Sequence, residues 1–208
     1  MRSENIQLIH FDEKRELYSP VQEIRNFYIL LSKNNIYRKF EYCMNLNGNC
    51  MNLNIRKAEE KDLDGILKLL RQVNDVHADG RPDLFIHGCT KYNTEELKTI
   101  LHTPDTPVFV AIDEYDEVAG YCFCVIQDHK GSNNLRPVKT LYIDDLCVDA
   151  AQRGRHIGRT LYDYTKDYAK RNDFYNLTLN VWSCNPNAMR FYESIGMKPM
   201  KIGMEEIL

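Results

Sequence analysis

The sequence has no run of apolar residues that approaches the roughly 18 needed to cross a membrane. Its N-terminus, MRSENIQLIHFDEK, also lacks the apolar core of a secretory signal. We therefore expect a soluble, cytoplasmic protein with no membrane partner. The net charge is only −3, from 27 Lys and Arg, 30 Asp and Glu. The overall electrostatics thus give no reason to expect nucleic acid as a partner.

Motifs for metals and nucleotides are missing as well. The seven cysteines include no CxxC pair, and no Cys/His spacing fits zinc. Cys122 and Cys124 lie in an apolar, strand-like run, where a thiol behaves as a small hydrophobic group. We therefore expect reduced, structural cysteines and no metal. The chain contains neither the P-loop pattern nor the GxGxxG dinucleotide fingerprint.

The first fifty residues differ in composition from the rest of the chain. They contain SPVQEIRNFYILLSK, which fits a helix capped at Ser19, and then an Asn-rich stretch without clear periodicity. Two interpretations of residues 1–50 stay open: an additional helical segment, or an incorrectly assigned start with Met51 as the initiator. We expect one domain over residues 53–208, because a chain with 43% hydrophobic residues can build one sizeable core plus an extension.

Hydrophobic periodicity predicts a mixed α/β sheet. After a strand at residues 54–58, apolar side chains recur at helical spacing from Leu63 to Val76. The remaining predicted elements are a helix capped at Asn93, a hairpin of strands 107–114 and 118–128, a strand at 138–148, a helix at 158–171, a strand at 176–182, a helix from its cap at Asn185 to Gly196, and a last strand at 198–208. This order of strands and helices is typical of a mixed α/β fold.

The segment RGRHIG, residues 153–158, follows a predicted strand end and opens a helix. The first turn of a helix has unpaired N–H groups at the positive end of its dipole, and small residues let an anion approach them. Arginine can also hold phosphate through two hydrogen bonds. The pattern favours a site for a phosphorylated ligand such as a pyrophosphate. The alternative, a helix start with a solvated basic turn, stays open.

RGRHIG, the Asn-x-x-Ala of NPNA and the segment RFYESIGMKP follow in the order and spacing of the GNAT superfamily of N-acetyltransferases. The chain resembles this family from about Leu53 to its C-terminus. The resemblance implies a GNAT (acyl-CoA N-acyltransferase) fold, with a mixed, mostly antiparallel sheet and helices on both faces. It also implies acetyl-CoA as cosubstrate and an amine as acceptor. One departure is His156, which stands where the family usually has glycine.

The resemblance implies a coenzyme site, residue by residue. The backbone of Leu146, Cys147 and Val148 would pair with the pantetheine arm, much as an exposed strand edge pairs with a peptide. The loop and helix start would hold the pyrophosphate through Arg153, Gly154, Arg155, His156, Ile157, Gly158 and Arg159. Asn185 matches the family's Asn before the last helix, where capping and coenzyme contact are compatible roles.

The segment IDDLCV most resembles the corresponding strand of the diamine acetyltransferase branch. By this match, Asp144 takes the place of a proton-relay carboxylate, and Asp145 that of an acid that holds a cationic acceptor. Neighbouring strand residues point to opposite faces, so the two share one role only if a bulge intervenes. Tyr192 matches the tyrosine that protonates the leaving thiolate. Backbone N–H groups near Cys147 match the family's oxyanion donors.

The segment VHADGRPDLF resembles an acceptor-binding stretch of some family members, in which Asp79, Asp83 and Phe85 would line the amine site. A solvated loop is the alternative. Trp182 is expected in the core. Acidic residues near the strand end favour a cationic amine on a small molecule or a protein.

Two other functions stay open. One is a catalytically idle GNAT-fold protein that binds CoA as a sensor or scaffold. The other is a nucleic-acid-binding module, which the 20 Lys and Arg against 24 Asp and Glu after residue 50 disfavour. A homodimer is also left open.

Overall fold

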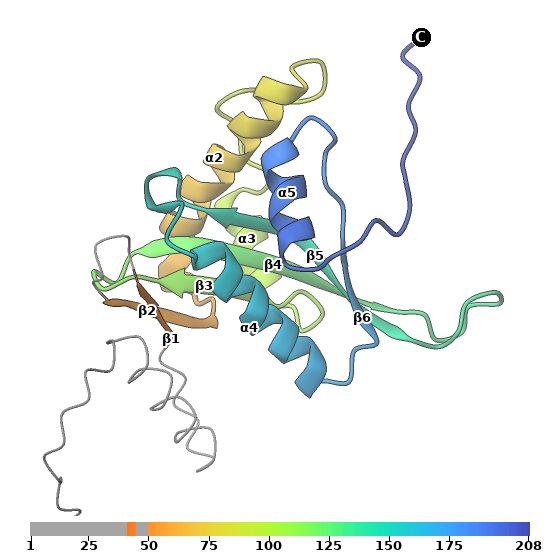
Figure 1. Ribbon diagram of the computed structural model, residues 1–208, viewed down its shortest axis with the longest axis horizontal. Helices are drawn as coiled ribbons and strands as arrows, with labels where there is room; N and C mark the ends of the chain where they lie inside the picture. The colour runs from red at the N-terminus through yellow and green to blue at the C-terminus, as the bar shows by residue number, and fades with distance from the viewer. Residues whose placement is uncertain (1–40, 45–49) are drawn as a thin grey trace, which may run out of the picture. The chain divides into compact units, whose positions relative to one another are not determined.

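The computed structural model describes residues 41–44 and 50–208, with side chains from residue 53 onward (Figure 1). The predicted helix at Ser19 lies outside these residues. The strands are β1 (Glu41–Met44), β2 (Cys50–Lys57), β3 (Val108–Ile112), β4 (Val118–Asp128), β5 (Lys139–Val148) and β6 (Asn176–Leu179). The helices are α2 (Leu63–Gly80), α3 (Thr94–His102), α4 (Ile157–Arg171) and α5 (Pro186–Ser194), with 3-10 turns η1 (Glu60–Asp62) and η2 (Ala150–Gln152).

The six strands form one sheet in chain order, from β1 to β6. Every neighbouring pair from β1 to β5 is antiparallel, whereas β5 and β6 are parallel. A parallel pair needs a crossover, and α4 supplies it. The predicted mixed, mostly antiparallel sheet is therefore confirmed. β1 pairs with β2, so the sheet begins before residue 53.

Helices cover both faces of this sheet, as predicted. On one face, Leu161 and Ala169 of α4 pack with Phe109 and Cys122 of the strands. On the other face, α2 and α3 pack through residues such as Ile66 against β3 and β4 (Figure 1). Alternate strand residues serve opposite faces, so buried strands such as β3, VFVAI, are apolar throughout.

The predicted caps of α3 and α5 are confirmed. Asn93 accepts a hydrogen bond from the Glu96 N–H at 2.9 Å, and the Glu96 carboxylate accepts from the Asn93 N–H at 2.8 Å. This reciprocal pair satisfies two N–H groups that the helix itself leaves unpaired. Asn185 likewise accepts from the Ala188 N–H at 3.0 Å. Asn185 thereby fixes the point at which α5 begins.

The predicted last strand is wrong, because residues 198–208 form no strand. Met200, Ile202 and Met204 alternate as in a strand, but they are 71, 80 and 91% exposed. An alternating pattern makes a strand only when a neighbouring strand accepts its hydrogen bonds. In the part of the chain that the structure describes, the last strand of the sheet is β6. No helix in that part is long and apolar enough to span a membrane.

The approach of β4 to β5 depends on Gly120. A Cβ atom there would lie 2.8 Å from the Cys147 carbonyl oxygen and 3.0 Å from Leu161 Cδ1. We expect Gly120→Ala to lower the free energy of unfolding by about 1–3 kcal/mol, because backbone atoms must shift to admit the methyl group. Urea unfolding would measure the change, with Gly203→Ala as the control, since a Cβ there meets nothing within 4 Å. Equal midpoints for the two variants would contradict the expectation.

Candidate active site

A β-bulge in β5 places two carboxylates on the same face of the sheet. Phe123 pairs with Asp145, but Cys124, the next residue, pairs with Ile143, so Asp144 is an extra residue in its strand. The bulge shifts the alternation of side chains by one position. Ile143 packs on the α4 face. Asp144 and Asp145 instead contact side chains of the α2 and α3 face, where Cys147 also packs.

Asp145 is held in a desolvated position. Its Oδ2 accepts a hydrogen bond from the Tyr121 hydroxyl at 2.9 Å. Burial raises the pKa of Asp145 to about 6, against smaller lowering effects of the Tyr121 hydrogen bond and the Lys91 charge. A carboxylate with this pKa is mostly ionised at neutral pH, yet it is a stronger base than an exposed aspartate. Asp145 is therefore suited to accept a proton.

Asp144 has a different environment, because a cation already pairs with it. Lys91, in the loop between α2 and α3, donates to Asp144 Oδ2 at 2.7 Å, and the Tyr92 hydroxyl donates to the same oxygen at 3.2 Å. The Lys91 ammonium also lies 5.3 Å from the centre of the Tyr92 ring. Burial lowers the pKa of Lys91, but the contacts with Asp144 outweigh it and leave the pKa raised. Lys91 thus stays charged.

Beyond the bulge, one edge of β5 is free of its neighbour. The pairing of β5 with β6 ends at Ile143 and Leu179, although β5 continues to Val148. Leu146, Cys147 and Val148, predicted to contact the coenzyme, lie on this segment. The Cys147 thiol is buried and donates to the Leu69 carbonyl at 3.7 Å. Burial raises its pKa to about 12, so it is not a thiolate nucleophile at neutral pH.

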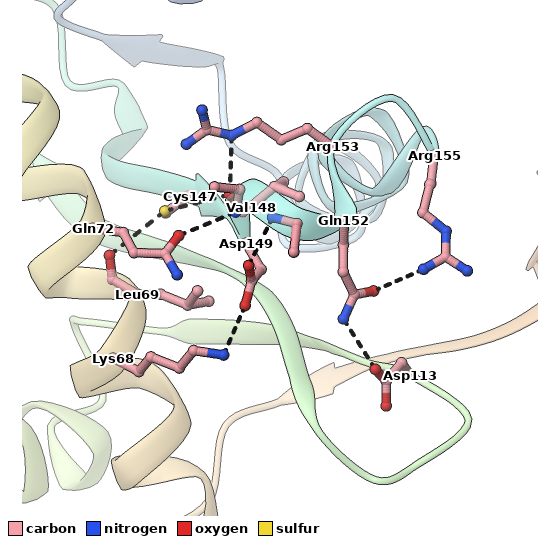
Figure 2. A network of polar contacts seen from close by, with 12 residues as sticks. Lys68, Leu69, Gln72, Asp113, Cys147, Val148, Asp149, Gln152, Arg153 and Arg155 are labelled. Carbon is pink, nitrogen blue, oxygen red and sulfur yellow. Dashed lines mark hydrogen bonds and ion pairs between the residues drawn. The ribbon is translucent and has the colours of Figure 1, made fainter.

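Polar contacts fix the turn that follows β5 (Figure 2). Asp149 accepts from the Ala151 N–H at 3.0 Å and pairs with Lys68 of α2 at 2.9 Å. Gln72, also on α2, accepts from the Ala150 N–H at 3.1 Å. Burial opposes ionisation of Asp149, but the Lys68 and backbone contacts leave its pKa below the ordinary value. The turn into α4 is therefore anchored to α2.

The predicted pyrophosphate loop, residues 153–158, lies between this turn and α4. Gly154 has φ +79° and His156 has φ +60°. The latter conformation favours glycine, which gives a physical reason for the family's usual residue at position 156. No side chain caps α4 at His156. Its first-turn N–H groups thus remain available to a ligand.

The arginines of the loop and of the first turn of α4 contact residues just outside the segment 153–158. Arg153 Nε donates to the Val148 carbonyl at 3.3 Å, and Arg155 Nη1 contacts Gln152 Oε1 at 3.4 Å. Figure 2 shows both guanidinium groups extending from the loop. Arg159, on the first turn of α4, pairs with Asp163 at 2.8 Å.

The start of α4 packs directly against α5. A Cβ atom on Gly158 would lie 3.5 Å from both Phe191 Cζ and Val148 Cγ2, so Gly158 lets these two side chains approach the helix start. Tyr192 stacks edge-on with Phe191, with ring centres 5.1 Å apart. Burial, and then the nearby Cys122 and Asp145, raise the pKa of Tyr192. Its phenol therefore keeps its proton at neutral pH.

The three predicted acceptor residues, Asp79, Asp83 and Phe85, have different partners in the structure. Asp79 faces His87 at 3.4 Å. Asp83 pairs with Arg81 at 2.7 Å, and Arg81 also binds Glu205 of the C-terminal segment at 2.8 Å. Asp79 therefore has an imidazole as its neighbour, and Asp83 has a guanidinium group.

Phe85 instead belongs to an aromatic cluster with His77 and Trp182. Its ring centre lies 5.1 Å from that of His77 and 5.4 Å from that of Trp182. The core prediction for Trp182 is wrong, since the residue is 41% exposed. Its strand ends earlier than predicted, at Leu179, so Trp182 lies on a loop.

Sequence reasoning missed Lys91, Tyr92 and Tyr121. The first two lie in a loop, and no local pattern connects them to a strand more than fifty residues later. Tyr121 did carry a signal, because a tyrosine in a buried strand needs a hydrogen-bond partner for its hydroxyl.

A model of the acetyltransferase (GNAT) family matches residues 71–197, and the chain belongs to this family. A crystal structure of a tetramutant of the BH1408 protein from Bacillus halodurans is 30% identical, with a TM-score of 0.71, over 74% of this chain and 99% of that one. Glucosamine-6-phosphate N-acetyltransferase from Arabidopsis thaliana is 25% identical, with a TM-score of 0.55, over 74% and 97% of the two chains.

An aminoglycoside acetyltransferase from an uncultured soil metagenomic sample, solved with sisomicin, is 20% identical. It covers 75% of this chain and 96% of its own, with a TM-score of 0.59. At this identity the likeness shows a shared fold. Together with the family match, it confirms the predicted GNAT fold.

The desolvation of Asp145 makes a prediction about stability. Its pKa of about 6 lies above the ordinary value of 3.8, so the folded state binds more protons between these pH values, and the free energy of unfolding falls as pH rises through them. Asp145→Asn has no carboxyl group to ionise, so it removes this fall in the free energy of unfolding. We expect the variant to gain about 3 kcal/mol over the wild type by pH 7, with the gain growing between pH 4 and 6 and then level.

Urea unfolding across this pH range would measure the gain. Asp64→Asn, at an exposed position on α2, is the control for removing a carboxylate. A difference between Asp145→Asn and the wild type that does not depend on pH would contradict the expectation.

Proposed function

We propose that this protein transfers an acetyl group from acetyl-CoA to a primary amine, by direct attack in a ternary complex. The observation that carries the proposal is the bulge at Asp144 together with the free edge that follows it. It brings a proton-accepting carboxylate beside a strand edge that can pair with an extended ligand. That edge leads directly to the uncapped start of α4.

The residues of the strand end and loop fit the coenzyme. The amides of pantetheine can hydrogen-bond the backbone of residues 146–148, as a peptide adds to a sheet edge. The N–H groups at the start of α4, with Arg153 and Arg155, suit a diphosphate. Acetyl-CoA supplies an activated acyl group as a thioester. The likeness to the family's acetyltransferases supports this choice.

Asp145 is the residue that we propose accepts the proton of the acceptor amine, directly or through water. An amine must be neutral to attack, and free alkylamines are mostly protonated at neutral pH. The resemblance to the diamine branch assigns this role to Asp144 instead. The contacts favour Asp145, because Asp144 Oδ2 already accepts from the Lys91 ammonium at 2.7 Å and from the Tyr92 hydroxyl at 3.2 Å.

Tyr192 is proposed as the acid that protonates the leaving thiolate. Its phenol is neutral at physiological pH and lies within electrostatic reach of Asp145 and Cys147. The N–H groups of residues near Cys147 are proposed to stabilise the tetrahedral oxyanion. The Cys147 thiol, with a pKa of about 12, is not suited to carry an acetyl group. This environment supports direct transfer over an acetyl-cysteine intermediate.

The domain and its setting belong to the same proposal. Residues 53–208 are proposed to form the acetyltransferase domain, acting in the cytoplasm on a soluble amine. The segment resembling the diamine branch makes diamines one class of acceptor to test.

Coenzyme binding tests the site independently of any acceptor. We expect Arg153→Glu to weaken the affinity for acetyl-CoA by about tenfold or more, because it replaces a cation near the diphosphate with an anion. Isothermal titration calorimetry would measure the affinity. Arg136→Glu, in the loop between β4 and β5, is the matched charge reversal. Equal affinities in the two variants, or no heat with the wild type, would refute the assigned site.

The pH dependence tests the proton acceptor. We expect kcat/KM to rise with pH through an apparent pKa near 6 as Asp145 ionises. Tyr121→Phe removes a hydrogen bond that stabilises the carboxylate, so this limb should move to higher pH. Tyr115→Phe, at an exposed turn, should leave it in place.

The rival function, a catalytically idle CoA-binding protein, gives a different result. It predicts heat on titration with acetyl-CoA but no thiol release with any amine of a broad panel. That outcome would replace acetyl transfer by coenzyme sensing or scaffolding.

A further inference from the structure

We propose that the acceptor is a small monoamine with an apolar or aromatic body, and that Lys91 and Trp182 determine this specificity. The inference rests on the function proposed above and names the acceptor class of the same site. Two independent observations support it: the ion pair of Lys91 with Asp144, next to the proposed reacting carboxylate, and the exposed aromatic cluster of His77, Phe85 and Trp182.

Asp144, Asp83 and Glu205, three acids that could bind a second ammonium group, already pair with Lys or Arg. Lys91 lies 2.7 Å from Asp144 Oδ2. Arg81 lies 2.7 Å from Asp83 and 2.8 Å from Glu205. A diamine would have to displace Lys91 from Asp144, and the charge of Lys91 would then repel it. The site is therefore built against acceptors with two or more positive charges.

The aromatic cluster offers an apolar surface in the same region. Phe85 meets the Trp182 ring edge-on, with ring centres 5.4 Å apart, and Trp182 is 41% exposed. The Arg81 guanidinium lies 6.0 Å from the centre of the Trp182 ring. The Arg81 cation thus already interacts with the Trp182 indole. The part of the indole that Arg81 does not cover can contact an apolar group of the acceptor.

The loop that carries Trp182 is joined to the strand that carries the carboxylates. Asn180, two residues before Trp182, donates to the Tyr142 hydroxyl at 3.1 Å, and Tyr142 lies two residues before Asp144 on β5. Burial, and then the charge of Lys91, lower the pKa of His77. His77 is therefore largely uncharged at neutral pH and adds aromatic surface rather than a cation. An amine whose nitrogen reaches Asp145 can extend its body toward this cluster.

The test compares amines that differ in one feature. n-Butylamine and 1,4-diaminobutane share a four-carbon chain and differ by one amino group, whereas 2-phenylethylamine adds a ring. For the wild type we expect kcat/KM with acetyl-CoA to be highest for 2-phenylethylamine and about tenfold lower for 1,4-diaminobutane than for n-butylamine, the size of one unfavourable charge contact.

Lys91 variants test the charge. Lys91→Met should abolish the preference for n-butylamine over 1,4-diaminobutane, and Lys91→Gln is a second neutral variant in case the first folds poorly. Lys91→Arg keeps the charge and should keep the preference. An unchanged ratio in both neutral variants would overturn the role of Lys91.

Trp182 variants test the apolar surface. Trp182→Ala should lower kcat/KM for 2-phenylethylamine by about tenfold and that for n-butylamine by less than threefold, because only the ring loses its contact. Tyr175→Ala removes another exposed aromatic ring, outside the cluster, and should change neither. Equal losses for both amines would overturn the role of Trp182.

The proposed function and this inference fail in different ways. A wild type that acetylates 1,4-diaminobutane, an aminoglycoside or only peptides best would overturn the acceptor class and leave acetyl transfer intact. A wild type that binds acetyl-CoA but acetylates no amine would overturn both.

Discussion

The extra residue at Asp144 is the feature on which the rest of the site depends. In a regular strand, Asp145 would point to the α4 face with Ile143. The bulge turns it to the face of α2 and α3, where the Tyr121 hydroxyl meets it. A bulge costs ladder hydrogen bonds and is typically found where a side chain must be re-aimed. Here it gives one strand two adjacent acids with different surroundings.

The two acids differ in the charge of their hydrogen-bond partners. Asp144 accepts from the Lys91 ammonium and the Tyr92 hydroxyl, whereas Asp145 accepts from the neutral Tyr121 hydroxyl and its burial raises its pKa. The helix α2 packs against the same strand end, because its Leu69 accepts from the Cys147 thiol and its Gln72 accepts from the Ala150 N–H. The chemistry of the strand end is thus tied to the packing of one helix.

Local signals in the sequence predicted much of the fold. Asn93 and Asn185 cap their helices because a short polar side chain and its N–H partner are three residues apart. The prediction of a last strand was wrong because alternation at Met200 and Ile202 does not show whether a partner strand exists. For the same reason, the sequence predicted that the strand from residue 176 continues to Trp182, although it ends at Leu179.

At the site, the sequence could not predict contacts between residues that lie far apart in the chain. The pair Asp144 and Asp145 is visible in the sequence, and only a bulge can bring two neighbouring strand residues to one face. Lys91, which separates their roles, lies in a loop whose position depends on how α2 and α3 pack. The φ of His156 likewise appears only once the loop is built.

Amide hydrogen exchange with and without acetyl-CoA tests most directly whether the coenzyme lies along the free edge of β5. The account predicts slower exchange at residues 146–148 and at 154–158 when acetyl-CoA is added, with little change at residues 140–143, which already pair with β6. Protection confined to other parts of the chain, or none at saturating coenzyme, would contradict it.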